Sequence, residues 1–327
     1  MTKVCVFGAG AIGGYIAARL AIKDECEVSV VARGAHLDAI RANGLTLKQG
    51  GETHTVRIAA SSDASDLGPQ DFVIITLKAG AIPAAVPQIQ RLLGPETAVL
   101  YAQNGLPWWY FHKHIGPFDD RRLESVDPGG IIWTGLGPDR AIGSVVWQAA
   151  ELEGPGMVVH NYGDRMPIGE PSGEKSPRCA ALSALLTGAG FKSPVKTNLR
   201  TEIWLKLWQN LSFNPVSVLT KGTLAELAAD PGTHRVIRTM MEEARAVAEA
   251  YGIAFAVDVE ERITMTAKAG AHRTSMLQDL EAGKPTELDA ILGSVIELAQ
   301  MISMETPALK LVYDLVKFRT RANEVRG

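Results

Sequence analysis

The sequence has few cysteines, few aromatic residues and no run of charge of one sign. The three cysteines (Cys5, Cys26 and Cys179) lie far apart and form no C-x-x-C pair, which argues against a disulfide framework and a structural zinc site. Lys and Arg total 33 against 36 Asp and Glu, and aromatic residues make up 6%. A chain without a basic stripe or a stacking platform is expected to bind neither nucleic acid nor an anionic membrane surface.

A membrane segment is not expected either. Residues 4–22 are apolar except for Arg19, a pattern shared by membrane spans and signal peptides. Four glycines interrupt this stretch and a single lysine precedes it, so we expect a soluble, cytoplasmic protein. The length of 327 residues favours two domains, and a hydrophobic share of 46% is typical of a folded chain.

The N-terminal residues predict a βαβ unit. Residues 3–7 form a short apolar run that ends in a glycine-rich turn, a helical stretch follows, and residues 27–32 predict a second strand. Such units build parallel sheets. Further strands are expected at 72–77 and 98–102, which place Lys78 and Asn104 at carboxyl strand ends, where open α/β sheets bind ligands.

The composition and apolar pattern of the chain change twice after this predicted sheet. Residues 131–168 are Gly-rich and β-prone, and we expect them to extend the sheet with mostly antiparallel strands, such as 143–147 and 156–160. From about residue 198 the apolar spacing is helical nearly to the end. The sequence therefore predicts an α/β domain over 1–197, in which a parallel sheet has a partly antiparallel extension, and an all-helical domain over 198–327. Helices are expected at 202–211, 234–251, 258–268 and 287–304.

The glycine turn has the spacing G-x-G-x-x-G, which is weak evidence alone and stronger between a strand and a helix. Gly8 permits the tight turn, Gly10 allows a pyrophosphate close to the backbone, and Gly13 allows helix and strand to pack closely. We expect a dinucleotide to bind here, although a turn required only for packing remains an alternative. The expected cofactor-binding residues of this turn are Gly8, Ala9, Gly10, Ala11, Ile12 and Gly13.

The end of the second strand indicates which dinucleotide binds. NAD sites place an acidic residue there, whereas this chain has Arg33, 20 residues after Gly13. A guanidinium favours a 2′-phosphate through charge-assisted hydrogen bonds. We therefore predict NADPH/NADP+ rather than NAD, with a solvated surface arginine as the alternative.

A second group of polar residues opens the C-terminal part. Lys206, Asn210 and Asn214 are four residues apart and would share one helix face. Asn is a mediocre helix former, so two asparagines in register with a lysine suggest a functional site. An ordinary solvent-exposed helix face fits the spacing equally well. Pro215 is expected to bend or end this helix.

These motifs together resemble the ketopantoate reductase family (2-dehydropantoate 2-reductase). The resemblance covers most of the chain and implies a Rossmann-type N-terminal domain, a helical C-terminal domain, an active site in the cleft between them, and reduction of ketopantoate to (R)-pantoate with NADPH. The motifs that carry it are the glycine turn with Gly14, Arg33, Thr76-Leu-Lys78-Ala, Gln103-Asn104-Gly105, Lys206-x3-Asn210-x3-Asn214-Pro215, Thr274-Ser275-Met-Leu-Gln-Asp279 and Thr286-Glu287-Leu-Asp289.

The resemblance also implies roles for individual residues. Lys206 would be the general acid, and Glu287 would bind a substrate hydroxyl or the lysine itself. Ser275 would bind the substrate carboxylate. Asn210 and Asn214 would orient the substrate. Lys78 and Asn104 would face the cofactor and the substrate. Without the resemblance, Ser275 is a loop serine and Glu287 an ordinary first-turn glutamate.

The aromatic stretch Trp108–His114 departs from the compact family pattern. It could reshape the substrate pocket, but burial of Trp108, Trp109 and Tyr110 against the sheet or a partner subunit is the favoured interpretation. His112 and His114 lack a third nearby ligand, so no metal site is assigned. The alternatives to ketopantoate reduction are a related 2-keto-acid or β-hydroxyacid dehydrogenase and a non-catalytic NADP(H) sensor. A small 2-keto acid is the expected partner, and a homodimer is left open.

Overall fold

The computed structural model describes residues 1–324 and divides the chain into two compact units. Unit 1 contains residues 1–103, 107–122 and 127–199. Of the described residues, unit 2 contains 104–106, 123–126 and 200–324. Two short segments that follow the strand at 93–101 therefore belong to the same unit as the C-terminal helices, although they are far from those helices in the sequence.

Unit 1 is an α/β structure. Its strands are β1 (Lys3–Phe7), β2 (Glu27–Val31), β3 (Leu45–Gln49), β4 (Glu52–Val56), β5 (Ala59–Ser61), β6 (Gln70–Ile75), β7 (Leu93–Tyr101), β8 (Ala141–Ser144), β9 (Ala149–Gly154), β10 (Met157–Tyr162) and β11 (Ile168–Gly169). Its α-helices are α1 (Ala11–Lys23), α2 (Gly34–Asn43), α3 (Ile82–Ile89), α4 (Ile131–Leu136) and α5 (Pro177–Gly188). Short 3₁₀ turns lie at Ala64–Asp66, Ala79–Ala81, Gln90–Leu92, Pro128–Gly130 and Pro138–Arg140.

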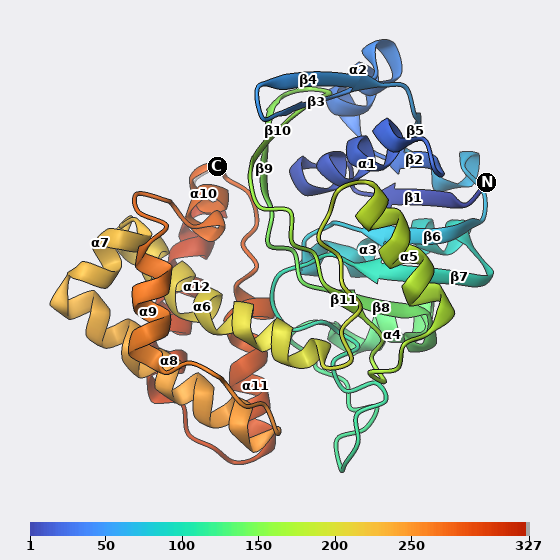
Figure 1. Ribbon diagram of the computed structural model, residues 1–327. Coiled ribbons are helices and arrows are strands. Elements are labelled where there is room, and N and C mark those ends of the chain that lie inside the picture. Colours follow the sequence, from blue (N-terminus) through green and yellow to red (C-terminus); the bar gives the residue numbers. More distant parts are fainter. Residues whose placement is uncertain (325–327) are drawn as a thin grey trace. The chain divides into compact units, whose positions relative to one another are not determined.

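The larger sheet has a doubly wound order. Within the described residues it contains seven strands in the order β11-β8-β7-β6-β1-β2-β5 (Figure 1). All pairs from β5 to β8 are parallel, and only β11 at the edge is antiparallel. From β5 to β8 this is the dinucleotide-binding order, with its reversal between β1 and β6, where such folds bind ligands. The predicted Rossmann-type sheet with a partly antiparallel extension is confirmed.

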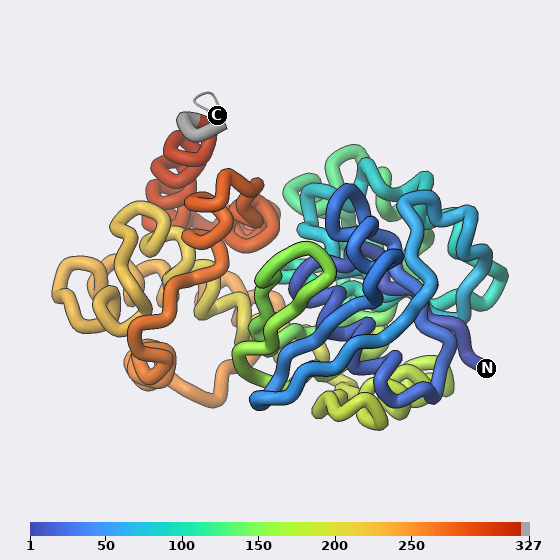
Figure 2. Tube along the Cα trace, turned by 90° about the horizontal axis from the view of Figure 1, so that it is seen from above, coloured from blue at the N-terminus to red at the C-terminus, as the bar shows by residue number. Residues whose placement is uncertain are grey.

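The finer prediction for residues 131–168 is wrong in two respects. β8 runs parallel to β7, and β10 belongs to a second sheet of order β4-β3-β10-β9. Figure 2 shows the β3–β4 and β9–β10 hairpins side by side. All four of these strands pack on α1, where a side chain at Gly14 would meet Val158 at 2.7 Å. The mixed exposed and buried pattern of β9 and β10 therefore reflects a layer that covers a helix, not an extended main sheet.

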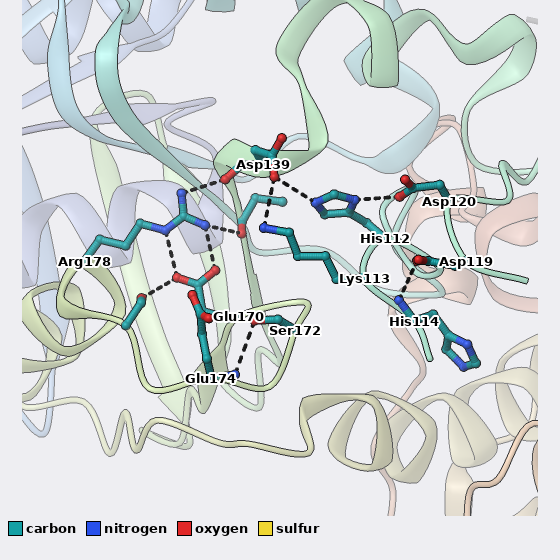
Figure 3. Close-up of polar contacts among 12 residues, drawn as sticks. His112, Lys113, His114, Asp119, Asp120, Asp139, Glu170, Ser172, Glu174 and Arg178 are labelled. Carbon is teal, nitrogen blue, oxygen red and sulfur yellow. Dashed lines mark hydrogen bonds and ion pairs between the residues drawn. The ribbon is translucent and has the colours of Figure 1, made fainter. Parts of the chain in front are cut away.

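The aromatic stretch is buried in unit 1, as favoured above. Trp109 packs so closely on β8 that a Cβ at Gly143 would lie 2.3 Å from its ring, and Trp108 makes an edge contact with Tyr101 of β7. His112 is buried and its ring lies between Asp120 and Asp139 (Figure 3). The contacts with these carboxylates give His112 a structural role within the loop, whose two tryptophans are buried.

Unit 2 is helical. It contains α6 (Leu199–Thr220, whose first residue clusters with unit 1), α7 (Leu224–Ala229), α8 (Pro231–Ala250), α9 (Val259–Ala267), α10 (Ser275–Glu281), a π-helical turn (Asp289–Gly293), α11 (Ser294–Met301) and α12 (Pro307–Glu324). The predicted end of a helix at Pro215 is wrong, because α6 continues through it. Every residue from 211 to 218 is buried, so tertiary packing offsets the roughly 3 kcal/mol that an internal proline costs.

Hydrogen bonds explain why two short segments belong to unit 2. The Leu106 N–H donates to the Ala290 carbonyl at 2.9 Å, and the Glu297 carboxylate accepts from the N–H groups of Glu124 and Ser125 at 2.8 and 2.9 Å. Both acceptors lie in the stretch formed by the π-helical turn and α11. This stretch therefore anchors residues 104–106 and 123–126.

Two features are absent from the described residues. No helix among them has the length and apolar character needed to cross a bilayer. Their His, Cys, Asp and Glu side chains include no group of three able to hold a metal ion.

Candidate functional site

The glycine turn joins β1 to α1 and is held to its neighbours by backbone hydrogen bonds. The N–H groups of Gly8 and Ala9 both donate to the Val31 carbonyl of β2, at 3.0 and 3.2 Å. Gly8 has a φ of +102°, which L side chains rarely adopt. The Thr76 hydroxyl, just after β6, donates to the Gly8 carbonyl at 2.5 Å. The turn is thus fixed where the order of the parallel sheet reverses.

Gly13 and Gly10 have different surroundings. A Cβ at Gly13 would lie 2.2 Å from the Gly8 carbonyl oxygen, so this glycine is required for packing of α1 on the turn. A Cβ at Gly10 would meet no described atom within 4 Å. Gly10 also precedes α1 without a side-chain hydrogen bond that caps the helix. This open backbone at a helix N-terminus has the geometry that binds a pyrophosphate, so unit 1 fits a dinucleotide.

The other predicted cofactor residues surround this turn. Ala9 belongs to the turn itself, and Ala11 and Ile12 form the first turn of α1. Arg33 follows β2, is exposed, and directly precedes α2. Lys78 follows β6 and is half-buried. All of them lie at or beyond the carboxyl ends of β1, β2 and β6, the edge where an open α/β sheet binds its ligand.

Unit 2 brings together three of the predicted site residues. The Lys206 ammonium on α6 donates to Asn104 Oδ1 at 2.8 Å. The same amide donates from Nδ2 to Glu287 Oε2 at 2.9 Å. All three side chains are half-buried. The Asn104 amide thus links an ammonium to a carboxylate and fixes the position of both.

The π-helical turn explains how Asn104 reaches this position. In this turn the Ser294 N–H bonds to Asp289, not to Ala290 as it would in an α-helix. The freed Ala290 carbonyl accepts from the Leu106 N–H and from the Ser294 hydroxyl. Gly105 permits this approach, because a Cβ there would lie 2.3 Å from the Ala290 oxygen. Glu287 directly precedes the first helical residue, so it does not lie in a first turn as the alternative interpretation required.

Burial sets the protonation of the lysine. It lowers the pKa of Lys206 to about 8, and the negative charge of Glu287 opposes the lowering. A general acid works best when its pKa lies close to the working pH, because it is then protonated yet gives up its proton readily. The arrangement therefore suits transfer of a proton to a developing alkoxide.

The remaining predicted substrate residues are on the same unit. Asn210 and Asn214 follow Lys206 on α6 at helical spacing; Asn210 is half-buried and Asn214 is 5% exposed. Ser275 is exposed at the start of α10, after Thr274, whose hydroxyl accepts from the Leu277 N–H. Side-chain hydrogen bonds join Asn104 to Lys206 and to Glu287. Asn210, Asn214 and Ser275 lie on the same unit as this trio.

The structural feature that positions the trio was not predicted from the sequence. Gly105 was noted only as part of a motif, and the π-helical turn was predicted as an ordinary helix. A π turn has no reliable sequence signal, but the Asn104-Gly105 pair does indicate a turn with a positive φ.

Comparison with known proteins gives two family models that match in order along the chain. "Ketopantoate reductase PanE/ApbA" matches residues 4–173, and "Ketopantoate reductase PanE/ApbA C terminal" matches residues 198–320. A 2-dehydropantoate 2-reductase from Mesorhizobium japonicum is 50% identical over 315 residues, which cover 96% of this chain and 97% of that protein.

Solved structures agree with these matches. The crystal structure of a protein from Ralstonia solanacearum, proposed to be a ketopantoate reductase, is 38% identical with a TM-score of 0.94 and covers 99% of both chains. A PanE/ApbA family ketopantoate reductase from Ralstonia eutropha is 28% identical with a TM-score of 0.85, covering 99% of this chain and all of that one. The similarity therefore extends over both units.

Proposed function

Because the chain belongs to the ketopantoate reductase family and is an oxidoreductase of the NAD(P)H-dependent kind, we propose that it reduces 2-dehydropantoate to (R)-pantoate with NADPH, a step of pantothenate biosynthesis. The observation that carries the proposal is the Lys206–Asn104–Glu287 trio. A proton donor of lowered pKa, held by a carboxamide and balanced by a carboxylate, serves reduction of a carbonyl. A sensor that only binds the cofactor has no use for it.

The chemistry needs one hydride and one proton. The reduced nicotinamide supplies the hydride when the cofactor is bound. Lys206 donates a proton from Nζ to the C2 carbonyl oxygen, so the keto group becomes a hydroxyl and the lysine becomes neutral until it is reprotonated. Its positive charge also attracts the negative charge that grows on this oxygen. Asn104 holds the ammonium in place, and Glu287 keeps it protonated at neutral pH.

The residues of unit 1 are proposed to hold the cofactor. The backbone from Gly8 to Gly13 and the N-terminus of α1 would bind the pyrophosphate. Arg33 would pair with the 2′-phosphate, which is the reason to prefer NADPH over NADH. Lys78 would add a positive charge beside the cofactor. The cofactor domain is thus proposed to be residues 1–197 without the segments 104–106 and 123–126, which join residues 198–327 in the substrate domain.

The polar residues of unit 2 are proposed to recognise the substrate. Ketopantoate carries a carboxylate, a keto group and a hydroxyl. Ser275 would bind the carboxylate, while Asn210, Asn214 and Glu287 would orient the keto and hydroxyl groups. Glu287 has a second role at this site, because its carboxylate also accepts from Asn104.

We propose that the protein is located in the cytoplasm, which is a reducing compartment. Cys5, Cys26 and Cys179 are buried free thiols, which persist best where disulfides do not form. The homodimer stays a prediction.

The experiment that tests the proposal is cofactor oxidation, followed by the absorbance of reduced nicotinamide, with ketopantoate and a panel of 2-keto acids. 2-Ketoisovalerate is the informative member, because it keeps the keto acid and lacks the hydroxymethyl group. We expect the highest kcat/KM for ketopantoate with NADPH. Preferred turnover of another acid would retain the reaction class and reject the substrate, and tight NADPH binding without turnover of any acid would reject catalysis.

A further inference from the structure

A histidine that the sequence analysis did not single out connects the proposed cofactor site to a distant hairpin. His36 lies on α2, three residues after Arg33, and is half-buried. Its Nδ1 accepts a hydrogen bond of 2.9 Å from the backbone N–H of Gly156, in the turn between β9 and β10. These two residues are 120 positions apart in the sequence.

The acceptor role of Nδ1 fixes the state of the ring. A neutral imidazole that accepts at Nδ1 carries its proton on Nε2. Burial lowers the pKa of His36, and the adjacent Ala9 backbone opposes that lowering in part. The Nε2 atom is buried on the side of the ring that faces the Ala9 backbone. The ring therefore lies between the glycine turn and the hairpin.

The same hairpin also contacts α1 and the start of β3. Val158 of β10 packs where a side chain at Gly14 would be, and the Gly156 carbonyl accepts from the Thr46 N–H at 2.8 Å. Gly156 itself has a φ of +75°, and a Cβ there would lie 3.1 Å from Ala39 of α2. The hairpin thus contacts both helices whose N-terminal ends form the proposed cofactor site.

We propose that His36 is a positioning residue for NADPH: by binding the Gly156 N–H it sets α2, and with it Arg33, at the distance from the glycine turn that a 2′-phosphorylated dinucleotide requires. The inference rests on the proposed function, since it assumes that Arg33 meets the 2′-phosphate. A residue that supports a binding group from behind affects affinity through geometry, not through contact.

The test is direct binding of NADPH and NADH, without substrate, to the wild type and three variants. His36→Leu introduces an apolar side chain of similar size and removes the acceptor. His36→Asn places its side-chain oxygen near the position of Nδ1 and should restore the bond. His54→Leu, at an exposed histidine of β4, is the matched control.

We expect His36→Leu to weaken NADPH binding about 3- to 12-fold, the scale of one lost neutral hydrogen bond, and NADH binding less than threefold. His36→Asn should bind NADPH within threefold of the wild type, as should His54→Leu. Equal weakening of both cofactors by His36→Leu, no weakening, or failure of His36→Asn to restore binding would each overturn the inference.

Folding and the proposed function are checked separately. Should His36→Leu not fold, the NADPH-to-NADH ratio of His36→Asn against the wild type decides, because an unchanged ratio is expected and a ratio reduced fivefold or more contradicts the positioning role. A wild type that binds NADH as tightly as NADPH would instead refute the proposed cofactor preference.

Discussion

The two units build their parts of the proposed site in opposite ways. In unit 1 the cofactor site is mostly backbone, and what matters at Gly10 and Gly13 is the absence of a side chain. In unit 2 the site is a set of side chains from separate segments: Asn104 is 102 residues from Lys206 and 183 from Glu287. The backbone site of unit 1 is local in sequence, and adding a side chain destroys it. The side-chain site of unit 2 depends on tertiary contacts, and removing a side chain destroys it.

The sharpest test of the side-chain site is Lys206→Ala. It removes the proton donor and should lower kcat about 10²–10⁴-fold while the KM for NADPH changes less than about twofold. Steady-state kinetics at saturating NADPH measure both values. Lys310→Ala, at an exposed lysine of α12, is the control that should retain full activity. Turnover by Lys206→Ala close to that of the wild type would remove Lys206 from the mechanism.

The charge of the cofactor site is tested by Arg33→Asp. A carboxylate in place of the guanidinium repels the 2′-phosphate, so the KM for NADPH should rise roughly 100-fold and that for NADH only a few-fold. The ratio of the two kcat/KM values is the readout. Arg235→Asp, at an exposed position of α8, should leave this ratio unchanged. An unchanged ratio in Arg33→Asp would show that this arginine is only a surface charge.

The two glycines of the turn should respond differently to alanine. Gly10 has a φ of −69° and open space around it, so Gly10→Ala should fold normally and raise the KM for NADPH about 10- to 100-fold by blocking the pyrophosphate. Gly13→Ala forces a Cβ onto the Gly8 carbonyl and should destabilise unit 1 by about 3 kcal/mol, lowering Tm by roughly 5–10 °C. Thermal unfolding and kinetics on both variants separate these outcomes; a Gly10→Ala variant with normal KM would contradict the pyrophosphate site.

The smallest expected effect concerns pH. Since Lys206 must be protonated to act as an acid and its pKa is about 8, kcat/KM for reduction should be constant below this pH and fall above it. Glu287 raises that pKa, so Glu287→Gln should move the fall to lower pH by up to about one unit. Glu305→Gln, which removes an exposed charge, should not move it. A shift to higher pH in Glu287→Gln would reverse the assigned coupling.

The same contrast explains what could be predicted from the sequence. The glycine turn, Arg33 and the parallel sheet follow from local motifs and apolar runs, because neighbouring residues make the βαβ unit. The second sheet could have been expected in part: Gly50-Gly51 between the alternating residues 45–49 and 52–56 is a hairpin signal that was not used. That this hairpin pairs with β10 is a long-range contact without a local signal.

Unit 2 shows where local rules fail. Pro215 favours a helix end, but burial on all sides of residues 211–218 outweighs that preference. Lys206 and Glu287 were singled out through the family resemblance, since spacing alone left a solvent face equally acceptable. That Asn104 hydrogen-bonds both residues depends on the Ala290 carbonyl released by a π turn, and no pattern within residues 104–106 predicts it.

The most direct measurement of the central claim is NADPH oxidation with ketopantoate by the wild type and by Lys206→Ala, with NADH and 2-ketoisovalerate assayed beside them. We predict that ketopantoate with NADPH gives the highest kcat/KM and that this activity falls at least about 100-fold in the variant, whose NADPH binding persists. Comparable turnover of 2-ketoisovalerate, equal use of NADH, or an active Lys206→Ala variant would contradict the substrate, the cofactor or the proton donor, respectively.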